Sequence, residues 1–150
     1  TRQGLPVFDR KKYPSAVEFR NGGYIMQNCD GDPDMVIIAT GSEVWVALEA
    51  AEKIVGYNVR VVNIGCWEIF DEQSEEYRQS VLGSDSALRV SIEAGITTGW
   101  EHYTGLNGLN IGINTFGESA PGNDVANYFG LIPEKVVDKI QKHLNSRFFI

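Results

Sequence analysis

Residues 35–64, which read MVIIATGSEVWVALEAAEKIVGYNVRVVNI, decide the fold of this chain. Two short apolar runs rich in β-branched residues, Met35–Ala39 and Val59–Ile64, have the length and composition of buried strands. Between them, Ser42–Val55 carries apolar residues at intervals of three and four, which is the spacing of a helix with one buried face. A strand, a helix and a second strand in this order form the repeating unit of an α/β domain.

The two ends of this helix carry residues that commonly begin and end helices. We expect Ser42 to cap the amino end and Gly56 to end the helix. Thr40, Gly41 and Ser42 also lie where a strand passes into a helix, and backbone amides at such a place can bind a phosphate. Because the further glycines and the lysine of a nucleotide-binding loop are missing, ordinary capping is favoured, and anion binding stays open as the less favoured interpretation.

The same pattern continues through the rest of the chain. Further strands are expected, two strong and one weak, at Leu88–Glu93, Leu109–Asn114 and Tyr24–Asn28. Further helices are expected at Asp71–Leu82, at Ser119–Phe129 and from Pro133 to about Asn145. The alternation predicts an α/β domain whose mostly parallel sheet is covered by helices on both faces.

The composition is that of one globular domain. The 150 residues are 43% hydrophobic and 22% charged. The net charge of -7 argues against a nucleic-acid partner or an anionic membrane surface, because both need clustered Lys and Arg. With two cysteines, Cys29 and Cys66, the chain cannot form a disulfide framework, so we expect a reducing compartment and place the protein in the cytoplasm. No apolar run approaches the ~20 residues that a membrane helix needs.

The first 21 residues differ from the rest of the chain. They show little periodicity and contain five of the thirteen basic residues, namely Arg2, Arg10, Lys11, Lys12 and Arg20. We interpret residues 1–21 as a connecting arm that enters a domain formed by residues 22–150. Since the first residue is Thr1 rather than Met, we expect either a processed chain or an excised piece of a longer one.

One acidic segment has part of a metal-binding motif. Asp30, Asp32 and Asp34 have the spacing of a calcium loop. However, Met35 occupies the position where that loop needs Gly, and Gly41 the position where it needs Glu. We therefore interpret the segment as a solvated turn before a strand.

Three further residues are weak candidates for chemistry. His102 and His143 have no Cys, His or carboxylate at a spacing that suits zinc. Glu93 lies at the carboxyl end of a predicted strand, where α/β proteins gather their sites, but a single Glu there is more often a structural acid than a catalyst. From the residues alone, we expect no catalytic, cofactor-binding or metal-binding residue in this chain.

A collinear set of motifs gives the chain a resemblance to a known family. The matching segments are Thr1–Pro6, Gly22–Tyr24, Ile38–Val44, Val59–Val62, Glu68–Gln73 with Tyr77 and Arg78, Arg89–Gly95, Gly105–Gly108 and Phe116–Gly122. Together they span nearly the whole chain, and they closely resemble the carboxyl-terminal domain of transketolase.

This resemblance implies both a fold and an activity. The fold would be a three-layer α/β/α domain with a mostly parallel five-stranded sheet, in which one edge strand can run antiparallel. The full-length enzymes of the family are homodimers that use thiamine diphosphate and a divalent metal, magnesium or calcium. They transfer a two-carbon ketol unit between sugar phosphates in the pentose phosphate pathway. Because two other domains hold the cofactor, we expect this chain alone to be inactive and to serve domain packing, dimer contact or regulation.

One functional residue can be carried over from the family. Arg2 matches the arginine of a Ser/Thr-Arg-Gln motif that binds the phosphate of the sugar substrate. A guanidinium suits that role better than an ammonium, because its planar fork can bind two phosphate oxygens. In the isolated chain we expect Arg2 to be an exposed arm residue, since the rest of the phosphate pocket belongs to the other domains.

Two alternatives stay open at this point. One is a regulatory module that binds an anionic metabolite at Ser42, where the helix begins. The other is the same domain of a related thiamine diphosphate enzyme such as dihydroxyacetone synthase.

Overall fold

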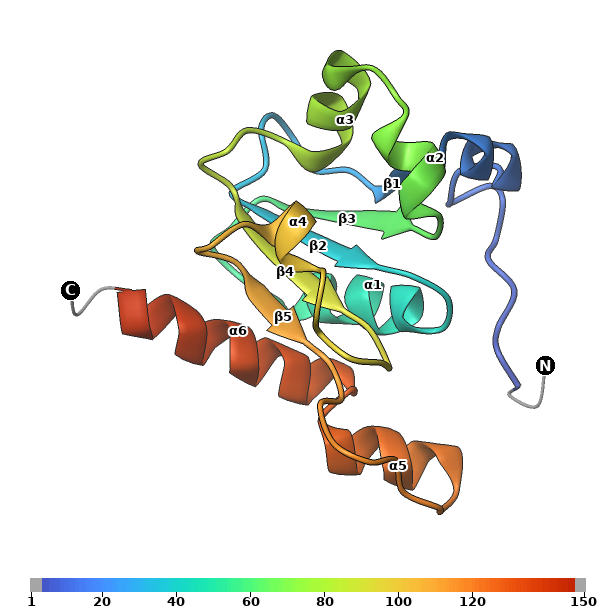
Figure 1. Ribbon diagram of the computed structural model, residues 1–150, viewed down its shortest axis with the longest axis vertical. Helices are drawn as coiled ribbons and strands as arrows, with labels where there is room; N and C mark the ends of the chain where they lie inside the picture. Colours follow the sequence, from blue (N-terminus) through green and yellow to red (C-terminus); the bar gives the residue numbers. More distant parts are fainter. Residues whose placement is uncertain (1–3, 148–150) are drawn as a thin grey trace.

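A five-stranded sheet with the strand order β1-β3-β2-β4-β5 lies at the centre of the protein (Figure 1). The structure is a computed structural model that describes residues 4–147. The strands are β1 (Gly23–Gln27), β2 (Met35–Ala39), β3 (Val59–Ile64), β4 (Leu88–Ile92) and β5 (Leu109–Ile111). β2 pairs in parallel with β3 and β4, and β4 pairs in parallel with β5, whereas the edge strand β1 runs antiparallel to β3.

This sheet confirms the predicted mostly parallel α/β fold with an antiparallel edge strand. β2 and β3 have the predicted bounds, and β4 ends at Ile92, one residue earlier than predicted. β1 begins and ends one residue earlier than predicted. Each of the four predicted runs and the weaker fifth one is therefore a strand of a single sheet.

Helices cover both faces of the sheet. They are η1 (a 3-10 helix, Ala16–Asn21), α1 (Glu43–Lys53), α2 (Trp67–Asp71), α3 (Glu75–Leu82), α4 (Glu101–Thr104), α5 (Gly122–Phe129) and α6 (Pro133–Arg147). α1 and α6 pack on one face, and α2, α3 and α4 pack on the other (Figure 1). None of the helices within residues 4–147 has the length and apolar character to cross a membrane.

Alternate residues of β2 enter two separate apolar cores. Met35 and Ile37 belong to the core that contains Leu48 of α1, whereas Val36 belongs to the core that contains Phe70 of α2. All five of these side chains are fully buried. A strand that is buried on both faces must be apolar at every position, which explains why the runs in the sequence are continuous rather than alternating.

The prediction of one continuous helix over Asp71–Leu82 is wrong, because two separate helices, α2 and α3, meet in this part of the chain. α2 ends at Asp71, and α3 begins at Glu75. Between them, the Ser74 backbone leaves the helical conformation, and the Ser74 hydroxyl accepts a hydrogen bond from the Tyr77 amide at 3.2 Å. A serine that caps a helix in this way competes with helix continuation, so the chain breaks at this residue.

The two ends of α1 also differ from the prediction. Ser42 has helical backbone angles, and its hydroxyl donates to the Glu43 carboxylate at 2.8 Å instead of capping the helix. The helix ends at Lys53, two residues earlier than predicted, because Ile54 adopts an extended conformation. The expected cap at Ser42 is therefore wrong, although the predicted helix itself is present.

The end of β5 and the start of α5 also differ from the prediction. β5 ends at Ile111, three residues earlier than predicted, and a Cβ atom on the following Gly112 would lie 2.6 Å from the Gly95 carbonyl oxygen, which favours glycine at this close approach. α5 begins at Gly122, so Ser119 precedes the helix and does not cap it as predicted. The last helix, α6, confirms the prediction.

Two aromatic residues of the amino-terminal arm pack on the domain, although most of the arm is exposed. The Phe8 ring stacks on the Trp45 ring of α1 at a centroid distance of 4.4 Å, and Tyr13 is buried beside them. At the end of η1, which the sequence did not predict, the Gly22 carbonyl accepts hydrogen bonds from the Gly65 and Cys66 amides, both at 3.0 Å. The division of the chain at residue 21 stays a prediction.

Substitution of Gly22 tests how closely the end of η1 packs against the segment that follows β3. Its φ is +76°, and a Cβ atom there would lie 2.5 Å from the Cys66 carbonyl oxygen. Gly22→Ala should therefore destabilise the chain by about 1–2 kcal/mol for the left-handed backbone and by a further ~1–3 kcal/mol for overpacking. The matched control is Gly56→Ala, because Gly56 has a φ of +85° but no atom within 4 Å. Urea unfolding followed by circular dichroism measures both, and equal losses would contradict the close approach at Gly22.

Candidate functional site

The carboxyl ends of β2, β4 and β5 meet at one edge of the sheet, which we call the carboxyl edge. At this edge Thr40 follows β2, Glu93 follows β4 and Gly112 follows β5. The three strands run parallel, so the loops that leave them lie side by side. Open α/β sheets bind their ligands at this edge, and it is therefore the first place to look for a site.

A cavity of 740 Å³ opens at the carboxyl edge. It lies between the amino-terminal arm, the start of α1, the loops after β4 and β5, and α5. Apolar side chains from all of these elements line it, among them Leu5, Trp45, Ile113, Val125 and Phe129. Four other cavities in the described part of the chain have volumes of 370 Å³ or less. The arrangement offers a wide, mostly apolar depression with a polar rim near the start of α1.

Two carboxylates give this edge its charge. Glu43 lies in the first turn of α1 and lines the cavity. Glu93 is half-buried beside it, and both its burial and the negative charge of Glu43 raise its pKa above the ordinary value. Neither carboxylate forms an ion pair with another residue between 4 and 147. As far as residues 4–147 show, the carboxyl edge is therefore locally anionic and has no cation paired with these two carboxylates.

This charge argues against the anion site that the sequence left open at Ser42. The Ser42 hydroxyl is already bound to the Glu43 carboxylate. A phosphate at the start of α1 would have to approach both Glu43 and Glu93, and two like charges at short range repel it. The helix terminus alone does not offset that repulsion, because its dipole acts as only about half a positive charge.

The other candidate residues of the sequence lie elsewhere. Arg2 falls outside the described residues. Asp30, Asp32 and Asp34 form an exposed turn at the opposite edge of the sheet, where the Asp34 carboxylate accepts a hydrogen bond from the Asn58 amide at 2.8 Å. Among residues 4–147, no group of three or more His, Cys, Asp and Glu side chains could hold a metal ion.

The two histidines make contacts that hold loops in place. His102 Nε2 lies 3.2 Å from both carboxylate oxygens of Asp71, and the Tyr103 hydroxyl donates to the same carboxylate at 3.0 Å. Burial and the charge of Asp71 raise the pKa of Tyr103 strongly. His143 is half-buried and contacts the Asn107 carbonyl oxygen through Nε2 at 3.1 Å. None of these residues lines the cavity at the carboxyl edge.

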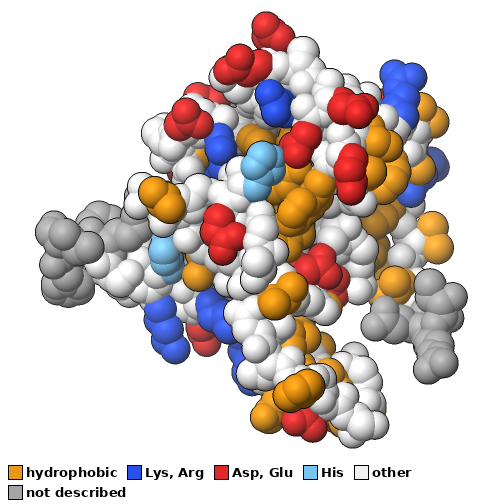
Figure 2. Space-filling view, viewed as in Figure 1, with side chains coloured by type: hydrophobic (Ala, Val, Ile, Leu, Met, Phe, Trp, Pro, Cys, Tyr) orange, Lys and Arg blue, Asp and Glu red, His pale blue; other side chains and the backbone are white. Residues whose placement is uncertain are grey.

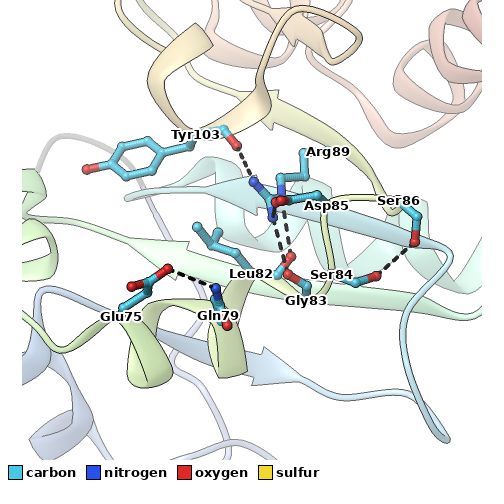
Figure 3. Close-up of polar contacts among 9 residues, drawn as sticks. All are labelled: Glu75, Gln79, Leu82, Gly83, Ser84, Asp85, Ser86, Arg89 and Tyr103. Carbon is cyan, nitrogen blue, oxygen red and sulfur yellow. Dashed lines mark hydrogen bonds and ion pairs between the residues drawn. The ribbon is translucent and has the colours of Figure 1, made fainter.

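Sequence reasoning missed a polar cluster at the opposite, amino edge of the sheet (Figure 3). Arg89 of β4 donates to the Leu82 and Gly83 carbonyls at the end of α3 at 3.3 and 3.2 Å. It also donates to the Tyr103 carbonyl at 3.3 Å and pairs with Asp85 at 3.2 Å. The guanidinium thus joins β4, α3 and α4.

Arg60 of β3 completes this cluster. It is buried, and it donates to the Ser80 and Val81 carbonyls at 2.9 and 3.2 Å and to the Asn28 side chain at 2.8 Å. Arg60 and Arg89 together bind the last carbonyls of α3, which have no partner inside the helix and carry its negative dipole end. The signal in the sequence was an arginine at the second position of each of two apolar strands.

Comparison with known proteins gives the family of the chain, which the geometry of the carboxyl edge does not identify. Residues 22–132 match the family model described as the transketolase-like TK C-terminal domain. The chain is 49% identical to transketolase of Aquifex aeolicus over 142 residues and 46% identical to transketolase 2 of Escherichia coli over 147 residues. These matches cover 93% and 96% of this chain but only 21% and 22% of the two relatives.

A solved structure gives the same result in three dimensions. A transketolase variant from Pichia stipitis, crystallised with fructose 6-phosphate, superimposes with a TM-score of 0.85 at 34% identity. The superposition covers 96% of this chain and 20% of that one. The chain therefore spans about a fifth of the length of these three relatives.

The raised pKa of Glu93 predicts how stability depends on pH. The folded chain holds this proton more tightly than the unfolded chain does, so Glu93 lowers stability as the pH rises above its ordinary pKa of 4.5 and through the raised folded value. Glu93→Gln should therefore be more stable than the parent 150-residue chain at pH 7, and the two should be equally stable well below pH 4.5. Thermal unfolding across this range measures the difference. Glu49→Gln on the exposed side of α1 is the control, and a pH-independent effect of Glu93→Gln would contradict the prediction.

Proposed function

Because this chain belongs to the transketolase family, in which it corresponds to the carboxyl-terminal domain, we propose that it works as one part of a longer enzyme. That enzyme transfers a two-carbon ketol unit between sugar phosphates. The observation that carries the proposal is the match along almost the whole chain to proteins of about five times its length, named as transketolases. The fructose 6-phosphate in the Pichia stipitis protein supports a sugar phosphate as the substrate class.

The described residues do not fit thiamine diphosphate or its metal ion. Glu43 and Glu93 would repel a diphosphate at the carboxyl edge, and residues 4–147 hold no cluster suited to a metal. We therefore propose that both groups bind to the rest of the full-length chain, with magnesium or calcium as the metal. No catalytic step is assigned to a described residue of this domain, whose role is to support the other domains.

The remaining features of the proposal concern assembly and compartment. A homodimer is the form that the family relationship supports for the full-length enzyme. The two cysteines, Cys29 and Cys66, are both free, and this supports a reducing compartment such as the cytoplasm. One relative, from Solanum tuberosum, is named as a chloroplastic transketolase.

The alternatives to this proposal are weaker. A regulatory module for anionic metabolites needs a positive site at Ser42, and the neighbouring Glu43 and Glu93 provide the opposite charge. Dihydroxyacetone synthase shares this domain by resemblance, but the relatives that match at 49% and 46% identity are named as transketolases.

The first test is turnover by the isolated chain. The 150 residues should show no transfer from xylulose 5-phosphate to ribose 5-phosphate in the presence of thiamine diphosphate and magnesium, because the groups that hold the cofactor are elsewhere. The control is the full-length protein in the same coupled assay. Measurable turnover by the isolated chain would refute its assignment as an inert part of the enzyme.

The second test concerns Arg2, which we propose binds the phosphate of the sugar substrate. In the full-length enzyme, Arg2→Gln should raise the KM for xylulose 5-phosphate by about 10- to 100-fold, since a hydrogen bond to a charged group contributes ~1.5–3 kcal/mol. The KM of Arg2→Lys should lie between those of the parent enzyme and Arg2→Gln, because a lysine keeps the positive charge but loses the planar fork that binds two phosphate oxygens.

Two controls make this test specific for phosphate. With unphosphorylated xylulose as donor, Arg2→Gln should leave the KM unchanged. Arg10→Gln should have no effect on either substrate, because Arg10 donates to the Pro14 carbonyl at 2.7 Å within the arm. An equal loss with both sugars would show that Arg2 does not act through the phosphate.

A further inference from the structure

α5 is an amphipathic helix that the described chain leaves uncovered. It has eight residues and buries none of them. Val125, Ala126 and Phe129 line the cavity at the carboxyl edge, while the Tyr128 side chain is 71% exposed. Figure 1 shows α5 standing away from the sheet at one end of the molecule, and Figure 2 shows hydrophobic side chains at that same end. A helix this short is marginal in water by itself, so its position calls for further contacts.

Other exposed apolar side chains come from the segments that leave the same edge. Val7 of the arm is 89% exposed, Ile96 after β4 is 64% exposed and Phe116 after β5 is 96% exposed. Exposed apolar side chains indicate an interaction site when they extend an apolar cavity, whereas singly scattered ones do not. We call the carboxyl-edge surface formed by α5, the cavity, these three side chains and Glu93, which follows β4, the edge face.

The charge of the edge face indicates what would cover it. Glu43 and Glu93 have no ion-pair partner within residues 4–147, and Glu93 is half-buried even without a cover. Covering the face with an apolar surface alone would bury both charges at a cost of several kcal/mol. A covering surface that presents a Lys or Arg side chain removes that cost.

The length of the relatives indicates where the cover comes from. They are about five times as long as this chain, and the matching region is their carboxyl-terminal domain, so the rest of the protein precedes it. The described arm begins at Gly4, and Gly4, Leu5 and Pro6 line the cavity. The first described residues of the arm therefore lie at the edge face itself.

We propose that the edge face is covered by the part of the full-length chain that precedes residue 4, and that this part places a Lys or Arg side chain against Glu43 and Glu93. The inference rests on the proposed function, because it takes the chain to be the carboxyl-terminal domain of a longer protein. It adds the surface, its occupant and the charge of the contact.

Hydrogen exchange on the full-length protein tests the occupant. If the preceding part covers the edge face, the α5 amides exchange at least about tenfold more slowly than the unstructured rate, and the protection does not change on dilution. Amides of α5 that exchange at the unstructured rate would overturn the proposal. Protection that disappears as the full-length protein dissociates into monomers would also overturn it, because a second copy would then be the cover.

Two pairs of variants test the contact in the same full-length protein. Val125→Arg should raise α5 exchange towards the unstructured rate and lower the Tm, whereas Leu106→Arg, at a 101% exposed apolar residue on the amino edge, should change neither. Glu43→Lys should likewise raise α5 exchange, because it opposes the proposed basic side chain, whereas Glu49→Lys on the same helix should not. Equal effects within either pair would overturn the assigned contact.

The readout separates this proposal from the proposed function. Exchange of the α5 amides reports coverage whether or not the enzyme turns over, and turnover of the unmodified full-length protein is measured on the same sample. Protected α5 amides in a protein without transketolase activity would refute the function and support the surface. An active enzyme whose α5 amides are unprotected would support the proposed function and refute the proposed cover of the edge face.

Discussion

β2 is the constraint on which the rest of the structure depends. Its five residues, Met35–Ala39, pair with β3 on one side and with β4 on the other, and all of them are fully buried. No position along the strand can therefore carry a charged or reactive side chain towards solvent. Chemistry at the centre of the sheet is confined to the two ends of the strands. The useful comparison within this molecule is between its amino edge and its carboxyl edge.

The sequence predicts the sheet well because the strands are defined by local composition. β2 is buried on both faces, is apolar throughout and ends where the polar Thr40 follows, and β3 ends where Gly65 follows although Arg60 and Asn63 interrupt its apolar run. The break between α2 and α3 could not be predicted in the same way. Phe70 and Tyr77 have the spacing of one helical face, yet they lie on two helices with their rings 6.3 Å apart. Tertiary packing of the two aromatic rings produces the same pattern as a continuous helix.

The candidate site is predicted only in part for a related reason. Glu93 was correctly placed at the carboxyl edge, because the end of a strand can be read from the sequence. The cavity joins Leu5, Trp45 and Val125, which are separated by tens of residues and come together only in the fold. Arg60 and Arg89 carried a local signal, a charge inside an apolar strand, but their partners are carbonyls of α3 that no sequence pattern indicates.

The two edges of the sheet differ in how completely their polar groups are satisfied. At the amino edge, Arg60 and Arg89 bind the carbonyls that end α3, and the Asp34 carbonyl and carboxylate accept from Leu88 and Asn58, so these less exposed groups have partners within the domain, while Asp30 and Asp32 are exposed to solvent. At the carboxyl edge, no cation within residues 4–147 pairs with Glu43 or Glu93, and no residue of α5 is buried by the described chain. A folded domain minimises buried unpaired charge, so an edge that violates the rule while its opposite edge obeys it is incomplete in the domain taken alone. The unmatched edge is also the one that the amino-terminal arm reaches. Position, charge and apolar surface thus place the missing contact at the carboxyl edge, and the requirement for a basic residue follows from the two carboxylates alone.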